Sequence, residues 1–169
     1  MRTSRKILKS RFDHLLRELQ KALCAFYGRR LISVVIFGSV GRGKPHSESD
    51  IDILIVADPL PNGRMRRVEE FRAVRKELGS LMNEMGKEGI FTTLAPIFKT
   101  PAEISRGSLL FLDMIDDGRI LYDRRGFWKS FISDFQRRLR RLGARKIVVG
   151  ERWYWDLKPD YRPGEIFEI

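Results

Sequence analysis

The stretch Val34–Val56 reads VVIFGSVGRGKPHSESDIDILIV and is the part of the chain that decides the fold. It begins with apolar, β-branched residues, continues through a glycine-rich basic turn, and ends with two aspartates inside a second apolar run. Short apolar runs bounded by turn residues are typical of buried strands. The stretch therefore predicts two strands, roughly Leu31–Phe37 and Asp50–Val56, joined by a turn large enough to hold a phosphate.

The two aspartates and the glycine-rich turn predict a site for a metal and a phosphate. Asp50 and Asp52 are two positions apart on the second predicted strand, so their side chains project from the same face. Neighbouring carboxylates suit magnesium, which keeps several waters and takes further ligands from phosphates. Gly38 and Ser39 directly follow the first strand, where backbone N–H groups and a hydroxyl can hold phosphate oxygens. We expect a triphosphate and its metal to meet between the strands.

This arrangement resembles the signature of the nucleotidyltransferase superfamily, which includes DNA polymerase beta, and most closely its minimal nucleotidyltransferase branch. The G-S-x-x-R-G turn of that family is matched by Gly38, Ser39, Arg42 and Gly43, and its S-D-x-D by Ser49, Asp50 and Asp52. Both motifs occur at the family's spacing and each lies beside a predicted strand, which is the context that such a match requires. The resemblance implies an α/β (α+β) nucleotidyltransferase fold, a mixed β-sheet packed against helices.

The same resemblance implies a reaction and a set of site residues. The reaction is transfer of a nucleoside monophosphate from a magnesium nucleoside triphosphate to an acceptor hydroxyl, with release of pyrophosphate. Asp50 and Asp52 would be the catalytic ligands of one or two Mg²⁺ ions. The residues that would bind the nucleotide phosphates are Gly38, Ser39, Arg42 and Lys44.

One position departs from the family pattern. The third strand of the superfamily usually carries a third carboxylate that helps to bind metal and acts as general base. Our predicted third strand, Gly89–Phe98, places Thr93 or its neighbour Thr92 there, and Pro96 limits the strand to an edge or a bulge. A threonine hydroxyl is neither a strong base nor an anionic ligand. A pseudoenzyme that binds nucleotide or RNA without turnover is therefore an alternative to an active transferase.

A second alternative is an antitoxin-like protein. Minimal nucleotidyltransferases often accompany a small, helical HEPN-type partner, which they mask or modify with a nucleotide. RNA and protein both remain possible acceptors, because acceptor recognition lies outside the motif.

Apolar periodicity predicts further helices in residues 1–123, outside the two motifs. Apolar spacing predicts one helix over Phe12–Phe26 that is closed by Gly28, and a longer one over Val68–Met85 that is closed by Gly86. Thr100 to Glu103 resembles a capped helix start, and Gly118–Asp123 resembles a short strand. We place the nucleotidyltransferase domain at residues 1–123 and expect residues 124–169 to pack on it.

The C-terminal part combines a basic helix with an aromatic tail. A helix is predicted over Phe127–Leu142, and its basic end contains Arg137, Arg138, Arg140, Arg141, Arg145 and Lys146. We favour a solvated helix end over a phosphate-backbone platform, because no aromatic residues interleave with these cations. The non-helical tail from Trp153 onward resembles that of an archaeal group of nucleotidyltransferase-like proteins with no settled substrate. We favour packing of its aromatic side chains against the domain over stacking of Trp153, Trp155 or Tyr154 on a base.

The amino-acid composition indicates which partners and which cellular compartment to expect. Lys and Arg number 33 against 22 acidic residues, a net charge of +11, which suits acidic partners such as nucleotides or RNA and equally suits a thermophile with ion-pair networks. The single Cys24 excludes an internal disulfide and indicates a reducing compartment. No signal peptide or membrane span is apparent, so a cytoplasmic location is expected.

Overall fold

A computed structural model of the chain describes residues 2–150 and 152–167, and the side chains of residues 6–150 and 153–167. Contacts divide the chain into two compact units, Met1–Phe127 and Trp128–Ile169. The helices of the first unit are α1 (Arg2–Tyr27), α2 (Gly38–Gly41), α3 (Arg64–Glu77), α4 (Gly79–Lys87), α5 (Pro101–Ser105) and α6 (Met114–Asp117), with 3-10 turns at Gly28–Arg30, Leu109–Asp113 and Arg124–Gly126. Its strands are β1 (Leu31–Phe37), β2 (Ile51–Ala57), β3 (Leu94–Lys99) and β4 (Arg119–Asp123).

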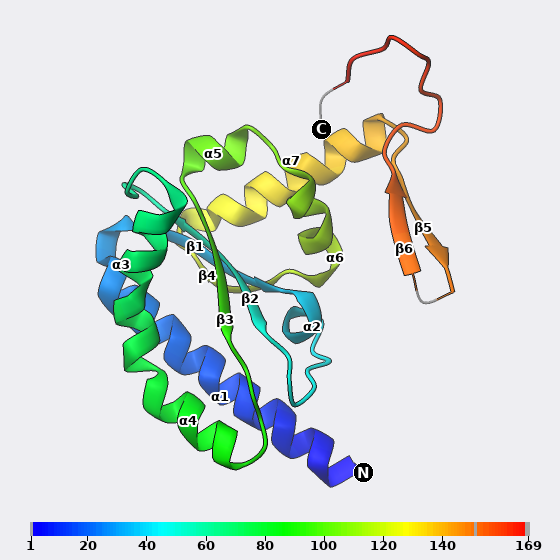
Figure 1. Cartoon of the computed structure of the whole chain (residues 1–169). Helices are drawn as coiled ribbons and strands as arrows, with labels where there is room; N and C mark the ends of the chain where they lie inside the picture. The colour runs from blue at the N-terminus through cyan, green and yellow to red at the C-terminus, as the bar shows by residue number, and fades with distance from the viewer. Residues whose placement is uncertain (1, 151, 168–169) are drawn as a thin grey trace. The chain divides into compact units, whose positions relative to one another are not determined.

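The four strands form one mixed sheet in the order β3-β2-β1-β4 (Figure 1). The central strand β1 runs antiparallel to both β2 and β4, whereas β2 and β3 are parallel. Every residue of β1 is buried, and all but Ser33 are apolar. This mixed sheet packed with helices confirms the predicted fold.

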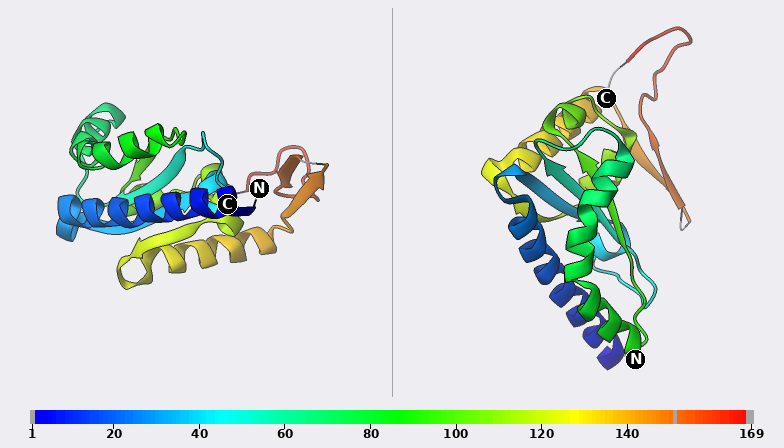
Figure 2. Two further views of the ribbon diagram at one scale, coloured as in Figure 1. Left: turned by 90° about the horizontal axis from the view of Figure 1, so that it is seen from below. Right: turned by 60° about the vertical axis from the view of Figure 1, so that its left-hand side comes forward.

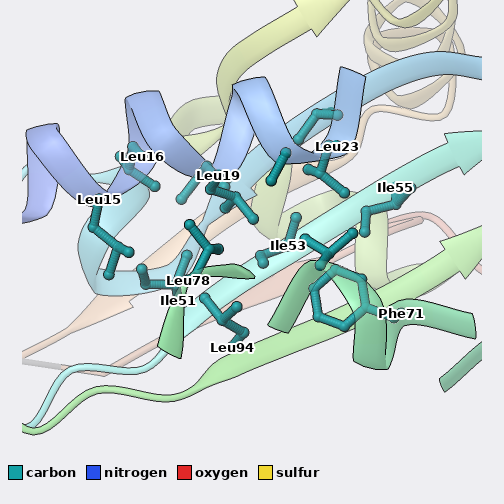
Figure 3. Packing of buried hydrophobic residues seen from close by; sticks show 14 of the residues in the cluster. Leu15, Leu16, Leu19, Leu23, Ile51, Ile53, Ile55, Phe71, Leu78 and Leu94 are labelled. Atoms are coloured by element: carbon teal, nitrogen blue, oxygen red, sulfur yellow. The ribbon is translucent and has the colours of Figure 1, made fainter. Parts of the chain in front are cut away.

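Three helices cover one face of the sheet. Leu15, Leu19 and Leu23 of α1 form one buried cluster with side chains of β2 such as Ile53 and with Phe71 of α3 (Figure 3). Figure 2 shows α1, α3 and α4 lying along this same side of the strands. None of the helices in the described part of the chain is long and apolar enough to cross a bilayer.

One helical prediction differs from the structure, and another is confirmed. The helix predicted over Val68–Met85 is two helices, α3 and α4, which meet at the buried Leu78 and at Gly79. Glycine lowers helix propensity, so the chain bends there while both helices keep their apolar side on the core. The start predicted from the capping pattern is confirmed, because the Thr100 hydroxyl accepts from the Glu103 backbone N–H and Glu103 accepts from the Thr100 N–H.

The predicted third strand was wrong at its beginning. It was placed over Gly89–Phe98, but β3 begins at Leu94, so Thr92 and Thr93 precede it. The loop before β2 is irregular, and it offers residues 90–93 only isolated bonds, such as Phe91 N–H to the Ser47 carbonyl, 2.7 Å. Regular pairing starts only where β2 itself starts, at the pair Ile51 and Leu94. The prediction that Pro96 confines this strand to an edge is confirmed.

The second unit contains most of α7 (Phe127–Arg141) and a two-stranded antiparallel hairpin of β5 (Arg145–Val149) and β6 (Arg152–Asp156). The basic run predicted for one helix end is therefore divided. Its first four arginines lie on α7, whereas Arg145 and Lys146 lie on β5. Gly143 has a positive φ of 70°, and its N–H bonds the Arg140 carbonyl, so the helix closes there and the chain leaves as a strand.

Candidate active site

The turn after β1 is shaped by a glycine that no other residue can replace without strain. Gly38 begins the short helix α2 with φ +67°, in the left-handed region. A Cβ at this position would lie 2.2 Å from Oδ2 of Asp52. The backbone of the turn and the carboxylate of β2 are therefore in direct contact, and the two sequence motifs meet at this point.

The two predicted metal ligands lie at the beginning of β2. Asp52 is half-buried and pairs with Phe37 of β1 on one side and Ala95 of β3 on the other. Asp50 stands just before the strand and is exposed. Burial raises the pKa of Asp52, the negative charge of Asp50 raises it further, and the nearby Arg42 partly offsets this. The pair is thus a concentration of negative charge that a cation would relieve.

Thr93 lies beside Asp50. Its hydroxyl donates to Oδ1 of Asp50 at 2.6 Å, and its backbone N–H reaches the same oxygen at 3.3 Å. Its carbonyl accepts from the Ile51 N–H at 2.9 Å. Thr93 therefore orients one carboxylate of the pair and adds no negative charge of its own.

A buried serine ties the loop between the two motifs together. Ser49 is 1% exposed. Its hydroxyl accepts from the Ser39 hydroxyl at 3.0 Å and from the His46 backbone N–H at 2.9 Å, and its carbonyl accepts from the Thr92 hydroxyl at 2.7 Å. The bonding role of Ser49 and Thr92 was missed in the sequence, although the serine of S-D-x-D was the available signal.

The basic residues of the turn have different surroundings. Arg42 donates to Oδ2 of Asp117 at 2.8 Å, and the Asp117 side chain is largely buried. Asp117 lies at the end of α6, and this ion pair brings it to the glycine-rich turn. Lys44 lies further along the loop with its side chain exposed.

Comparison with known proteins agrees with this geometry. Residues 16–87 match the model of the nucleotidyltransferase domain family, and this range contains β1, α2, β2 and both aspartates. Residues 16–87 carry the pattern of a nucleotidyltransferase domain. Enzymes with this domain transfer a nucleoside monophosphate, so the predicted family and enzyme class are confirmed.

Relatives extend the similarity over most of the chain. The protein named "Putative protein adenylyltransferase MJ1305", from Methanocaldococcus jannaschii, is 27% identical over 154 residues, which cover 90% of this chain and 95% of the relative. Among solved structures, a toxin-antitoxin with AMP-PNP is 22% identical over 72% of this chain and 87% of its own, with a TM-score of 0.42. The toxin-antitoxin MntA-HepT is 18% identical over 74% and 87%, with a TM-score of 0.41.

A nucleotidyltransferase uses a divalent metal, and the donors present fit one. Within residues 2–150 and 152–167, no group of three or more His, Cys, Asp or Glu side chains is arranged to hold a metal. Two carboxylates alone suit magnesium, which binds one or two of them and completes its octahedron with water and substrate phosphate. Asp52 lies against the Gly38 backbone, so the acidic pair directly adjoins the turn that would hold those phosphates.

Proposed function

We propose that the protein transfers an adenylyl group from magnesium ATP to a hydroxyl of a protein acceptor. The observation that carries this proposal is the acidic pair Asp50 and Asp52, whose charge Arg42 offsets only in part, held against the Gly38 turn within a nucleotidyltransferase domain. The adenylyl group and the protein acceptor are taken from the name of the relative that matches nearly the whole chain.

In the proposed reaction, the acceptor oxygen forms a bond to the α-phosphorus of ATP. The bond from that phosphorus to the oxygen leading to the β-phosphorus breaks, pyrophosphate leaves, and the acceptor hydroxyl releases its proton. Bound magnesium would orient the triphosphate and neutralise the charge that develops on it. Asp50 and Asp52 would hold the ion.

The turn would hold the other end of the triphosphate. The first N–H groups of a helix such as α2 have no partner within the helix, and they favour negative ligands. The Arg42 guanidinium would add donors for the β and γ phosphates, and the Ser39 hydroxyl would add one on turning away from Ser49. Lys44 would add charge at the exposed end of the loop.

A nucleotide-binding pseudoenzyme is the second candidate function. Its specific support is Thr93, whose hydroxyl bonds to Asp50 where the family usually has a third carboxylate. Without that carboxylate, the described part of the chain offers no obvious base for the acceptor proton. The pseudoenzyme would bind magnesium nucleotide as strongly as an enzyme but would leave it intact.

The deciding experiment follows two labels of ATP in an extract that contains acceptor proteins. Label at the α-phosphate should appear on protein, whereas label at the γ-phosphate should leave as pyrophosphate. Asp50→Asn or Asp52→Asn should lower transfer by about a thousandfold, and Glu77→Gln, at an exposed carboxylate on α3, should leave it unchanged. Tight nucleotide binding with no transferred label would favour the pseudoenzyme instead.

The variant Thr93→Asp also helps to distinguish an active transferase from a pseudoenzyme. If Thr93 occupies the position of the missing carboxylate, this variant should transfer faster, since general bases contribute about a hundredfold or more. Loss of magnesium-dependent nucleotide binding in this variant, alongside brisk transfer by the unaltered protein, would show that another base carries the reaction.

A helical HEPN-type protein is one candidate for the acceptor or partner. Co-expression of the two chains, followed by size-exclusion chromatography and intact mass measurement, tests it. A complex without added nucleotide mass would support masking, added nucleotide mass would support modification, and neither would exclude this partner.

A further inference from the structure

The hairpin of the second unit brings basic and aromatic side chains together. Lys146 of β5 pairs in register with Trp155 of β6, and Val148 pairs with Trp153. Paired positions share a face of a hairpin, so these four side chains lie on one side. Lys146 Nζ is 4.3 Å from the centre of the Trp153 ring, a cation–π contact. Cations and aromatic rings, separate in the sequence, therefore interleave in the folded hairpin.

Both faces of the hairpin remain accessible. Trp153 is 39% exposed on the first face, and Tyr154 is 55% exposed on the second. Val148 and Val149, one on each face, are more than 60% exposed. A two-stranded hairpin is only marginally stable in water unless something packs against it. Exposed aromatic rings on such an element indicate a binding surface rather than a core.

The charge of the region favours an anionic ligand. Residues 137–146 contain six arginines and lysines and no acidic residue. Arg140 and Arg141 are exposed at the end of α7, and Ala144 N–H bonds the Leu139 carbonyl at 2.9 Å where the chain turns into β5. This cationic end of the helix leads within a few residues to the aromatic hairpin.

The segment after β6 adds a hollow of about 680 Å³. Its lining includes the aromatic residues Tyr154, Trp155, Tyr161 and Phe167 and the charged residues Asp156, Lys158 and Glu165. Lys158 pairs with Asp160 and Glu165. Because carboxylates neutralise Lys158, the hollow offers a base its aromatic walls and leaves the phosphates to the cations of α7 and β5. Stacking of this kind tolerates any base, because every base has a π-face.

We propose that α7's basic end and the β5–β6 hairpin bind single-stranded nucleic acid. Bases stack on Trp153, and phosphates lie along Arg140, Arg141 and Lys146. The absence of acidic residues from 137–146, beside an exposed aromatic ring, favours a polyanion over a protein partner. This inference concerns the second unit alone and holds whether or not the nucleotidyltransferase domain turns over.

The test measures fluorescence anisotropy of labelled twelve-nucleotide oligo-uridine RNA and oligo-thymidine DNA with the full chain. Trp153→Ala should weaken binding about tenfold or more, whereas Trp153→Phe should retain most of it, since a phenyl ring still stacks. The double variant Arg140→Gln and Arg141→Gln should weaken binding and lower the salt slope by about 0.7 for each phosphate that is no longer neutralised. The matched control is Arg66→Gln with Arg72→Gln, which removes the same charge from exposed positions on α3.

Binding of either oligonucleotide with this pattern supports the proposal, and the comparison of the two tells RNA from DNA. Absence of binding at low salt, equal losses in the control variant, or equal affinity for duplexes would overturn it. Self-association that Trp153→Ala abolishes, seen by sedimentation without any nucleic acid, would show that a second copy of the chain covers the hairpin instead. Equal melting curves for the Ala and Phe variants exclude unfolding as the cause.

Discussion

The carboxylates at the two ends of the sheet, Glu103 and Asp52, have opposite electrostatic surroundings. Beyond the C-terminal end of β3, Glu103 accepts two hydrogen bonds from Arg67 at 2.8 and 3.0 Å and one from the Thr100 N–H, and these lower its pKa to about 2. At the other end, where β2 begins, burial and the charge of Asp50 raise the pKa of Asp52. Groups of the protein neutralise the negative charge of Glu103, whereas they leave that of Asp52 without an ion-pair partner in the described part of the chain.

This difference indicates that Glu103 has a structural role and Asp52 a functional one. Arg67 also donates to the carbonyls of Pro61 and Phe98, so its pair with Glu103 fastens α3, β3 and α5 together. Within the described part of the chain, Asp52 has no such partner, and the nearby cation Arg42 is already paired with Asp117. A carboxylate kept in a costly position without a dedicated internal partner indicates a ligand site.

The largest effect is expected from a substitution in the acidic pair, at the end of the sheet where β2 begins. Asp52→Asn should lower transfer by about a thousandfold, because a metal ligand contributes several kcal/mol to the transition state. The same variant should unfold at the same or a higher temperature, since a neutral amide removes a partly buried charge and its repulsion by Asp50. Transfer assays and thermal denaturation check both parts. A less stable variant would mean that the protein itself compensates the Asp52 charge.

Gly38→Ala tests the close contact at the same end. The new Cβ meets Asp52 Oδ2 at 2.2 Å and sits at a positive φ, so we expect a loss of about 3 kcal/mol in unfolding free energy. Gly43→Ala is the matched control, because its φ of +69° is nearly the same but no atom lies within 4 Å of its Cβ. It should cost about 1–2 kcal/mol.

A double-mutant cycle isolates the part due to contact. In an Asp52→Ala background the carboxylate is absent, so Gly38→Ala should cost no more than Gly43→Ala. Denaturant unfolding of the four proteins gives the coupling free energy. Equal costs of Gly38→Ala in both backgrounds would show that conformational strain alone explains the glycine.

Glu103→Gln tests the opposite end and should have a smaller effect. The folded-state pKa of Glu103, about 2, lies below its ordinary value of 4.5, so its ion pair stabilises the fold above pH 4.5 and this stabilisation is lost as the pH falls towards 2. The variant should be about 1 kcal/mol less stable at neutral pH, because solvent screens this partly exposed pair. The difference in unfolding free energy between the variant and the unaltered protein should disappear as the pH falls towards 2. A difference that stays constant down to pH 2 would contradict a stabilising ion pair between Glu103 and Arg67.

The smallest effect is expected at Asp117. Asp117→Asn removes the charge that holds Arg42, so nucleotide affinity should weaken about threefold, a change of less than about 1 kcal/mol. Calorimetry with magnesium ATP measures it. In an Arg42→Gln background the substitution should have no further effect. An undiminished effect there would show that Asp117 acts on the nucleotide by a route other than Arg42.

The sequence predicted most of the sheet and the meeting of the two motifs, because both depend on local patterns. The apolar run at 31–37 and the alternation around Asp52 are properties of single strands, and the spacing of the motifs is short. Residues contributed by distant segments were harder to assign. Asp117 reaches Arg42 across 75 positions, and no local periodicity encodes such a pair. The irregular path of residues 90–93 depends on the loop that they contact, so the beginning of β3 was misplaced.

The second unit shows the same limit. Helical periodicity ends gradually in an arginine-rich run, and charge patterns do not distinguish a helix end from a strand. The pairing of Lys146 with Trp155 depends on hairpin register, which follows from the turn and the packing of the two strands. The aromatic and basic residues were identified in the sequence, but their interleaving was not.

The antiparallel pairing of β1 with β2 also bears on how the protein folds. Only residues 38–50 separate the two strands, so they can pair at a small cost in loop-closure entropy, whereas β4 joins β1 only after more than 60 further residues. We expect the phosphate turn and both aspartates to come together early, on a hairpin that forms before the sheet is complete. A nucleotide bound at that stage would speed folding as well as stabilise the product.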